Sequence, residues 1–431
     1  MMPRRGLLRR ERTSAGRQAG SARVPTEASQ SRRHRPDYML LILALVLLGI
    51  GVIVIYAIGP ALAAISGTSE NHYINRQLVA IVISLIAFFV AANVPLALWQ
   101  KHKLLLLAAA GVMTLVALIM PVNPDYPAHR WVRLGTFSFQ SVELLKLALL
   151  IWIASLLGAR MQQGNGFDSK GLLKPLGIAL AGILIIVAGV QSDLGSTVVM
   201  VAMIAAMSVV AGIPMKRILM IGAVIIIGGI LLVAATPYRR DRLSTFLNPS
   251  ADCQSSGYQA CHAQIAVGSG GIIGQGLGSG AQAYGYLPKA ENDSIFAIYA
   301  EKFGFLGVAL MIGVFIGFFA RMRRIAERSE DPFARLIVVG VIAWLSVQAM
   351  MNIGAMLGLL PLKGITLPLV SYGGTSVVFI MTAIGLVFQI SRYTQFRLST
   401  YNETGNGGVH ENRLDRRRIR GAYHPTPGSR A

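Results

Sequence analysis

Cysteine and charged residues are both scarce in this chain. It has two cysteines, and charged residues make up 14% of its 431 residues. With so few thiols, and only His262 close to Cys253 and Cys261, a zinc site is disfavoured. No repeat of fixed period is present, which argues against a solenoid. The apolar segments do not alternate with polar residues, and this argues against a membrane β-barrel.

Long apolar runs dominate instead, and they are too long and too numerous for the cores of soluble domains. Backbone exposed to lipid must satisfy its own hydrogen bonds, so these runs are expected to be helices. We predict an all-α polytopic membrane protein with about ten transmembrane helices. The expected spans are 39–59, 77–98, 103–121, 141–158, 174–191, 194–212, 217–235, 294–320, 334–357 and 367–391.

The net charge of +21 suggests nucleic acid at first, but its distribution argues against that partner. With both termini in the cytoplasm, most Lys and Arg residues fall on inner segments, as the positive-inside rule expects. The predicted domains are a basic disordered tail (1–38), a ten-helix membrane domain (39–391) and a second such tail (392–431). The tails either set the topology or dock a partner. A large extracellular loop (236–293) is predicted between the seventh and eighth helices.

Both cysteines lie in this loop, on the side of the membrane where disulfides persist. Cys253 and Cys261 are eight residues apart, so a bridge would close a short hairpin. The alternative is two free thiols.

Several cations break the positive-inside rule and are the more informative for it. The outward ones considered for substrate binding are Arg130, Arg133, Arg239, Arg242 and Lys363. They either contact lipid headgroups and local acids such as Asp241, or they bind phosphate, for which arginine offers a bidentate fork.

Asp293 is the leading candidate for chemistry because it follows this loop at the mouth of a predicted helix. An ionisable group at such a depth is costly to place and indicates function. The glycine run 268–280 either approaches a ligand closely or forms a flexible loop. The interrupted apolar run 367–376, with Ser371 and Tyr372, either lines the substrate site or marks a helix kink.

Four further charged residues are expected to play structural, supporting roles inside the bundle. Glu143 and Lys146 are three residues apart and share a helix face. Asp193 lies near the outer end of two spans, and Glu301 is predicted two turns along the helix that begins near Asp293. Asn352 is expected to bond between helices.

Together these segments resemble the SEDS family, the FtsW- and RodA-like proteins of bacterial cell-wall synthesis. The resemblance covers about residues 39–391. The segments that carry it are Arg130-Trp-Val-Arg-Leu-Gly135, Phe137-Ser-Phe-Gln140 with Glu143 and Lys146, Gln191-Ser-Asp-Leu-Gly195, Gly268-Ser-Gly-Gly271, Gly274-Gln-Gly-Leu-Gly278, Tyr286-Leu-Pro288 with Asp293, Glu301, and Gly358 through Ser376.

Some positions depart from the usual family pattern. Pro-Glu-Ala-His-Thr-Asp becomes Pro288-Lys-Ala-Glu-Asn-Asp293, so Lys289 replaces an acid. Two prolines of other motifs read Ser141 and Ser192. Gly285 stands where some relatives carry an acid, so no role transfers there. The segments starting at Arg133 and Lys363 look more like the division branch than the elongation branch.

The resemblance implies a peptidoglycan glycosyltransferase that polymerises lipid II at the outer face of the bacterial cytoplasmic membrane, at the division septum. Asp293 would be the general base, and undecaprenyl diphosphate would leave. No organic cofactor and no dedicated metal site are expected; any Mg or Mn ion would be bound through the substrate diphosphate. The expected partner is a class B penicillin-binding transpeptidase. The alternatives are a lipid II flippase, an elongation-branch polymerase and a non-catalytic scaffold.

Overall fold

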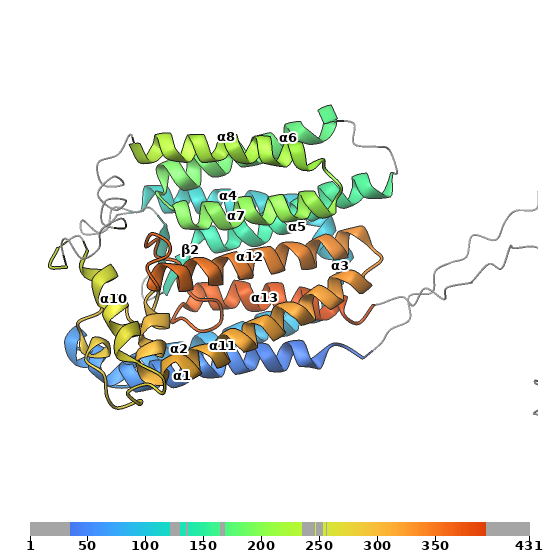
Figure 1. Ribbon diagram of the computed structural model, residues 1–431. Helices are drawn as coiled ribbons and strands as arrows, with labels where there is room; N and C mark the ends of the chain where they lie inside the picture. Colours follow the sequence, from blue (N-terminus) through green and yellow to red (C-terminus); the bar gives the residue numbers. More distant parts are fainter. Residues whose placement is uncertain are drawn as a thin grey trace, which may run out of the picture. The chain divides into compact units, whose positions relative to one another are not determined.

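The computed structural model describes residues 35–393 except 121–129, 135–136, 164–168, 235–245, 247–252 and 256. Both predicted tails fall almost wholly outside these residues, as do Arg239, Arg240, Asp241 and Arg242. Figure 1 shows the described part as a bundle of roughly parallel and antiparallel helices.

Helices make up most of the described chain, as predicted. They are α1 (Tyr38–Ser66), α2 (His72–Asn93), α3 (Leu96–Lys101), α4 (Lys103–Ile119), α5 (Ser141–Gln162), α6 (Ser169–Gly182), the π-helix η1 (Ile183–Val190), α7 (Leu194–Val210), α8 (Met215–Ala234), α10 (Tyr258–Ser269), the 3₁₀-helix η3 (Gln282–Tyr284), α11 (Ile295–Arg328), α12 (Pro332–Met356) and α13 (Gly374–Ile390).

Among the described residues, five helices are long and apolar enough to cross a membrane: α1, α2, α5, α11 and α12. Shorter apolar helices at 103–119, 174–190, 194–210 and 374–390 accompany them. The chain is therefore a multi-pass membrane protein by length and composition.

The centre of the bundle is α12, which packs against α5, α7, α11 and α13 (Figure 1). The side chain of Trp344 on this helix is fully buried. α13 packs most extensively against α2. Gly385 of α13 makes that approach possible, because a Cβ there would lie 2.6 Å from the carbonyl oxygen of Phe88.

The all-α prediction missed a β-hairpin, in which β1 (Trp131–Leu134) pairs antiparallel with β2 (Phe137–Gln140). Aromatic and β-branched residues at these positions favour a strand. Thr375 donates a 3.0 Å hydrogen bond to the carbonyl oxygen of Ser138. The hairpin therefore lies against the start of α13.

Two other expectations need correction. The segment 367–391 was predicted as one span, but α13 begins only at Gly374. The residues before it form irregular buried backbone, with Leu369 at a positive φ of 66°. The described part of the loop 236–293 contains a helix that was not expected, α10, whose alanines are good helix formers.

The glycine run wraps around an interruption in α11. Gly304 is non-helical, with φ 63° and ψ −163°. The break exposes backbone groups of α11, and the run satisfies them. The amides of Gln275 and Gly276 donate to the carbonyl oxygens of Glu301 and Lys302, at 2.9 and 3.0 Å.

Close approach explains why this segment is rich in glycine, and the partner is backbone. A Cβ on Gly270 would collide with the carbonyl oxygen of Ala300, and one on Gly274 with that of Lys302. The neighbouring Gly268, in contrast, has nothing within 4 Å of a Cβ position.

We therefore expect Gly270→Ala to destabilise the protein by about 1–3 kcal/mol, the usual cost of overpacking. Gly268→Ala is the matched control and should leave stability unchanged or slightly raised, because alanine favours helix. Thermal unfolding of both variants in detergent tests this. Equal stability of the two variants would show that α11 moves away to accommodate the new methyl group.

Candidate active site

Three stretches of chain meet at one end of the bundle. They are the loop 288–294 that leads into α11, the irregular segment 357–373 between α12 and α13, and Arg130 with the start of α7. Gly364 lies where they join. A Cβ placed there would be 3.5 Å from Asp293 Oδ2 and 4.0 Å from Arg130 Nη1. The carboxylate and the guanidinium therefore face the same point.

Asp293 lies just before Ser294, the N-cap of α11, rather than within that helix. Glu301 lies within the first two turns of α11, close to where the sequence predicted it. Asn352 of α12 fixes the backbone at Asp293. Its Nδ2 donates to the carbonyl oxygens of Asp293 and Ile365, both at 2.7 Å.

Ser371 and Tyr372 attach the same two stretches further along. The Ser371 hydroxyl donates to the carbonyl oxygen of Asn292 at 2.6 Å and accepts from the amide of Leu367 at 2.7 Å. The Tyr372 amide donates to the carbonyl oxygen of Glu291 at 2.9 Å. Because the Ser371 side chain is buried and engaged with backbone, its predicted substrate contact is replaced by a structural one.

The Asp293 carboxyl group is held in surroundings that disfavour its charge. Burial is the largest cause that raises its pKa, and the charge of Glu291 also raises it, so that the pKa is about 6 instead of the ordinary 3.8. Hydrogen bonding, partly from Gln259, and the charge of Lys289 act in the opposite direction. Its Oδ1 has no hydrogen-bond partner among the described residues. A carboxylate with a pKa near neutrality and an unused acceptor suits a general base.

Arg130 is positioned by the turn that precedes α7. Its Nη2 donates to the carbonyl oxygen of Ser192 at 2.6 Å, and its Nε lies 3.9 Å from Asp193 Oδ2. Asp193 also caps α7 by accepting from the amide of Ser196 at 3.0 Å. These contacts leave Nη1 as the nitrogen nearest to Gly364.

Lys363 belongs to the same region. Its Cβ lies 3.3 Å from the position that a Cβ on Gly195, at the start of α7, would occupy. Arg133 behaves differently. It is exposed on β1, opposite Ser138, and no described contact joins it to Asp293. Arg239 and Arg242 lie outside the described residues. Of the five predicted cations, the structure thus places Arg130 across Gly364 from Asp293 and Lys363 in the segment next to Gly364.

Two residues near the site, Arg76 and Gln259, were not predicted from the sequence. Arg76, at the start of α2, hydrogen-bonds Tyr372, whose ring lies 5.7 Å from that of Tyr73. Its position at the outer end of a predicted span resembles that of the other cations and was a usable signal. Gln259 had no such signal, because nothing in the sequence showed that residues around 258 form a helix next to Asp293.

Glu143 and Lys146 form a buried pair on α5, 2.7 Å apart. Lys146 also donates to Gln348 Oε1 at 3.2 Å and lies 5.0 Å from the centre of the Trp344 ring. Gln348 in turn donates to the carbonyl oxygen of Thr366 at 3.1 Å. This network connects the interior of the bundle to the segment that carries Gly364.

Glu301 was expected to have a structural, supporting role, and both Glu301 and its neighbour Lys302 bond to loop backbone. Glu301 Oε1 accepts from the amide of Gln282 at 3.0 Å. Lys302 donates to the carbonyl oxygen of Ser279 and lies 4.8 Å from the centre of the Tyr284 ring. Both side chains thus hold the chain between α10 and Asp293 against α11.

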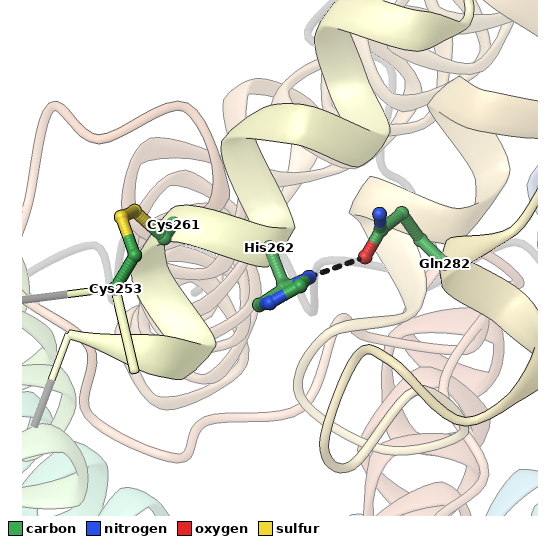
Figure 2. Close-up of a disulfide and its surroundings, with 4 residues drawn as sticks. All are labelled: Cys253, Cys261, His262 and Gln282. Atoms are coloured by element: carbon green, nitrogen blue, oxygen red, sulfur yellow. Dashed lines mark hydrogen bonds between the residues drawn. A yellow bond between two sulfur atoms is a disulfide. The ribbon is translucent and has the colours of Figure 1, made fainter. Parts of the chain in front are cut away.

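Cys253 and Cys261 form a disulfide with their Cα atoms 5.6 Å apart, within the usual range (Figure 2). The predicted bridge is therefore present. Cys261 lies in the first turns of α10 and Cys253 precedes that helix. Among the described residues, no group of three or more His, Cys, Asp or Glu side chains is arranged to hold a metal ion.

Comparison with known proteins identifies the family of this chain. Residues 38–396 match the family of cell cycle proteins that groups FtsW, RodA and SpoVE. Stage V sporulation protein E of Bacillus subtilis (strain 168) is 35% identical over 367 residues, which cover 85% of this chain and 100% of that protein. A probable peptidoglycan glycosyltransferase FtsW of Saccharophagus degradans is 34% identical over 372 residues, 85% of this chain and 95% of that protein.

Solved structures share the fold. RodA of Thermus thermophilus superimposes with a TM-score of 0.61 at 23% identity, covering 83% of this chain and 98% of that one. A chain of a peptidoglycan synthase complex that couples polymerization and crosslinking gives a TM-score of 0.67 at 23% identity, with the same coverage.

The fold and the comparisons define a helical, multi-pass membrane protein of the SEDS class. The chain belongs to the FtsW/RodA/SpoVE family and is FtsW-like, as the sequence resemblance implied.

The buried Glu143–Lys146 pair makes a prediction about stability. Lys146→Met leaves a buried carboxylate without its partner and should cost about 3–5 kcal/mol. The double variant Glu143→Leu/Lys146→Met removes both charges and should be clearly more stable than the single variant. Thermal unfolding of both in detergent measures this, and equal losses would mean that the two charges are not coupled.

Proposed function

We propose that this protein is a peptidoglycan glycosyltransferase that polymerises lipid II at the outer face of the cytoplasmic membrane during septal wall synthesis. The observation that carries the proposal is the meeting of Asp293 and Arg130 at Gly364. Relatives named as probable peptidoglycan glycosyltransferases support it.

The chemistry follows from the two charges. The acceptor hydroxyl is a weak nucleophile, and Asp293 would take its proton as it attacks the anomeric carbon of the donor. The bond from that carbon to the diphosphate breaks, and undecaprenyl diphosphate leaves. Arg130 and Lys363 would stabilise the charge that develops on this leaving group.

A divalent cation would supply further charge neutralisation. Because the described residues offer no metal site, Mg or Mn would be held mainly by the diphosphate itself. The protein's own part is then to orient the diphosphate with Arg130 and Lys363.

The proposed topology has ten spans, with both termini in the cytoplasm and the loop 236–293 outside. The apolar helices along the described chain and the preference of basic residues for the predicted inner segments support this proposal. This places Asp293 and the disulfide on the same, outer side. A class B penicillin-binding transpeptidase is the proposed partner, in keeping with the synthase complex that shares the fold.

Asp293→Asn tests the general base, because the amide keeps the size of the side chain and removes its basicity. We expect polymerisation of labelled lipid II to fall by at least 10²-fold, the usual contribution of a general base. Glu70→Gln, an exposed carboxylate between α1 and α2, is the control and should polymerise normally.

The assay uses the full chain in liposomes with its cognate transpeptidase. Polymer from Asp293→Asn at the wild-type rate would refute the assignment. Wild-type protein that moves lipid II across the bilayer without making polymer would be a flippase, and protein that does neither would be a scaffold.

The raised pKa of Asp293 predicts the pH dependence. The base works only when deprotonated, so activity should be full well above pH 6 and decline as pH falls through about 6. An ordinary carboxylate would retain activity to about pH 4. The rate of polymerisation between pH 4.5 and 8 measures this decline, which is the acid limb of the pH–rate profile. Full activity at pH 5 would contradict the prediction.

A further inference from the structure

Helix α10 reaches the loop that carries Asp293 through one side chain. The Nε2 atom of Gln259 donates to Ser294 Oγ at 3.1 Å, and that hydroxyl donates to the carbonyl oxygen of Pro288 at 2.9 Å. Ser294 is fully buried. Gln259 therefore contacts the residue that closes the loop 288–294 and starts α11.

Two attachments hold α10 next to this contact, and both lie within three residues of Gln259. The Cys253–Cys261 disulfide ties the first turns of the helix to the chain that precedes it. On the following residue, His262 Nδ1 lies 2.7 Å from Gln282 Oε1, as Figure 2 shows. The backbone amide of Gln282 in turn donates a hydrogen bond to the Glu301 side chain of α11.

The rings around His262 add to the second attachment. The centre of the His262 ring lies 4.2 Å from that of Tyr258 and 6.2 Å from that of Tyr286. α10 is thus fixed both to the chain before it and to the segment between it and Asp293. Such supporting contacts decide how well a reactive side chain is held in place.

We propose that Gln259 is a positioning residue for Asp293 and that the Cys253–Cys261 disulfide acts through it, by fixing the start of α10. This inference rests on the proposed function of Asp293. It assigns a role in the reaction rate to a bridge that could otherwise serve loop stability alone.

Asp293 has several charged or titratable neighbours that must be considered in a pH test. Lys289 and Glu291 lie on its own loop, Arg130 faces it across Gly364, and Lys363 belongs to the adjoining segment. Tyr258 and His262 are the titratable groups of α10, and the His262 ring faces Gln282. The substitution Gln259→Ala removes none of these charged or titratable groups. A change in the acid limb of the pH–rate profile therefore reports on the loss of the Gln259 side-chain amide.

The first experiment compares Gln259→Ala with Gln254→Ala, an exposed glutamine next to Cys253. We expect Gln259→Ala to lower kcat by about 10-fold to 100-fold, the effect of misplacing a reacting group by about 1 Å. KM for lipid II should change less than twofold. The acid limb should move to higher pH, because the amide hydrogen bond favours the charged carboxylate. Gln254→Ala should match the wild type.

The second experiment reduces the bridge in the folded wild-type protein with dithiothreitol, which is oxidised to its cyclic disulfide while two thiols form. Thiol labelling of Cys253 and Cys261 confirms the reduction. We expect the same fall in kcat and the same shift of the acid limb. Cys253→Ser/Cys261→Ser should show both changes before treatment and should not respond to the reductant.

The proposal is refuted if labelled, reduced protein keeps its kcat and its pH profile, or if Gln259→Ala does so. A rise in KM with kcat unchanged would also refute it, since this would place α10 in substrate binding. Failure of the proposed function is a separate result, because it would appear as normal polymerisation by Asp293→Asn.

Discussion

Irregular backbone inside a membrane protein must find hydrogen-bond partners, and the candidate site depends on how this chain meets that requirement. The segment 357–373 and the loop 288–294 are not helical, so their carbonyl and amide groups lack partners of their own. Side chains of α12 supply several of them, through Asn352 and Gln348. The same bonds that satisfy the backbone also set the position of Asp293.

Three parts of the fold support the candidate site. From the bundle, Lys146 and Gln348 connect a buried ion pair to Thr366, two residues from Gly364. From the segment before Asp293, the glycine run and α10 pack on α11, and α10 reaches Ser294 through Gln259. Arg130 joins from a third element, held by the turn at Ser192. Asp293 and Arg130 therefore rest on backbone contacts with several helices rather than on one mobile loop.

The sequence predicted the helical class, the approximate spans and the region of the site, because long apolar runs and misplaced charges are strong local signals. It did not predict where α13 begins, since Leu367, Leu369 and Val370 are as apolar as a helix would require. It also missed the hairpin at 131–140 and α10. These short elements are stabilised by tertiary contacts, such as Thr375 with Ser138 and the disulfide, which no local pattern reveals. The structural role of Ser371 was hidden for the same reason.

The way the Asp293 loop is anchored has a consequence for how this family can diverge. Asn352 and Ser371 bond to the carbonyl oxygens of Asp293 and Asn292, and the Tyr372 amide bonds to that of Glu291. Every amino acid presents such an oxygen, so these three anchors do not depend on the side chains of residues 291–293. Substitutions at 291 and 292 can therefore accumulate over evolutionary time without removing an anchor, whereas Lys289, at a positive φ of 54°, is restricted by its backbone conformation. The residues under the strictest selection for loop shape should be Asn352 and Ser371, which lie outside the loop altogether.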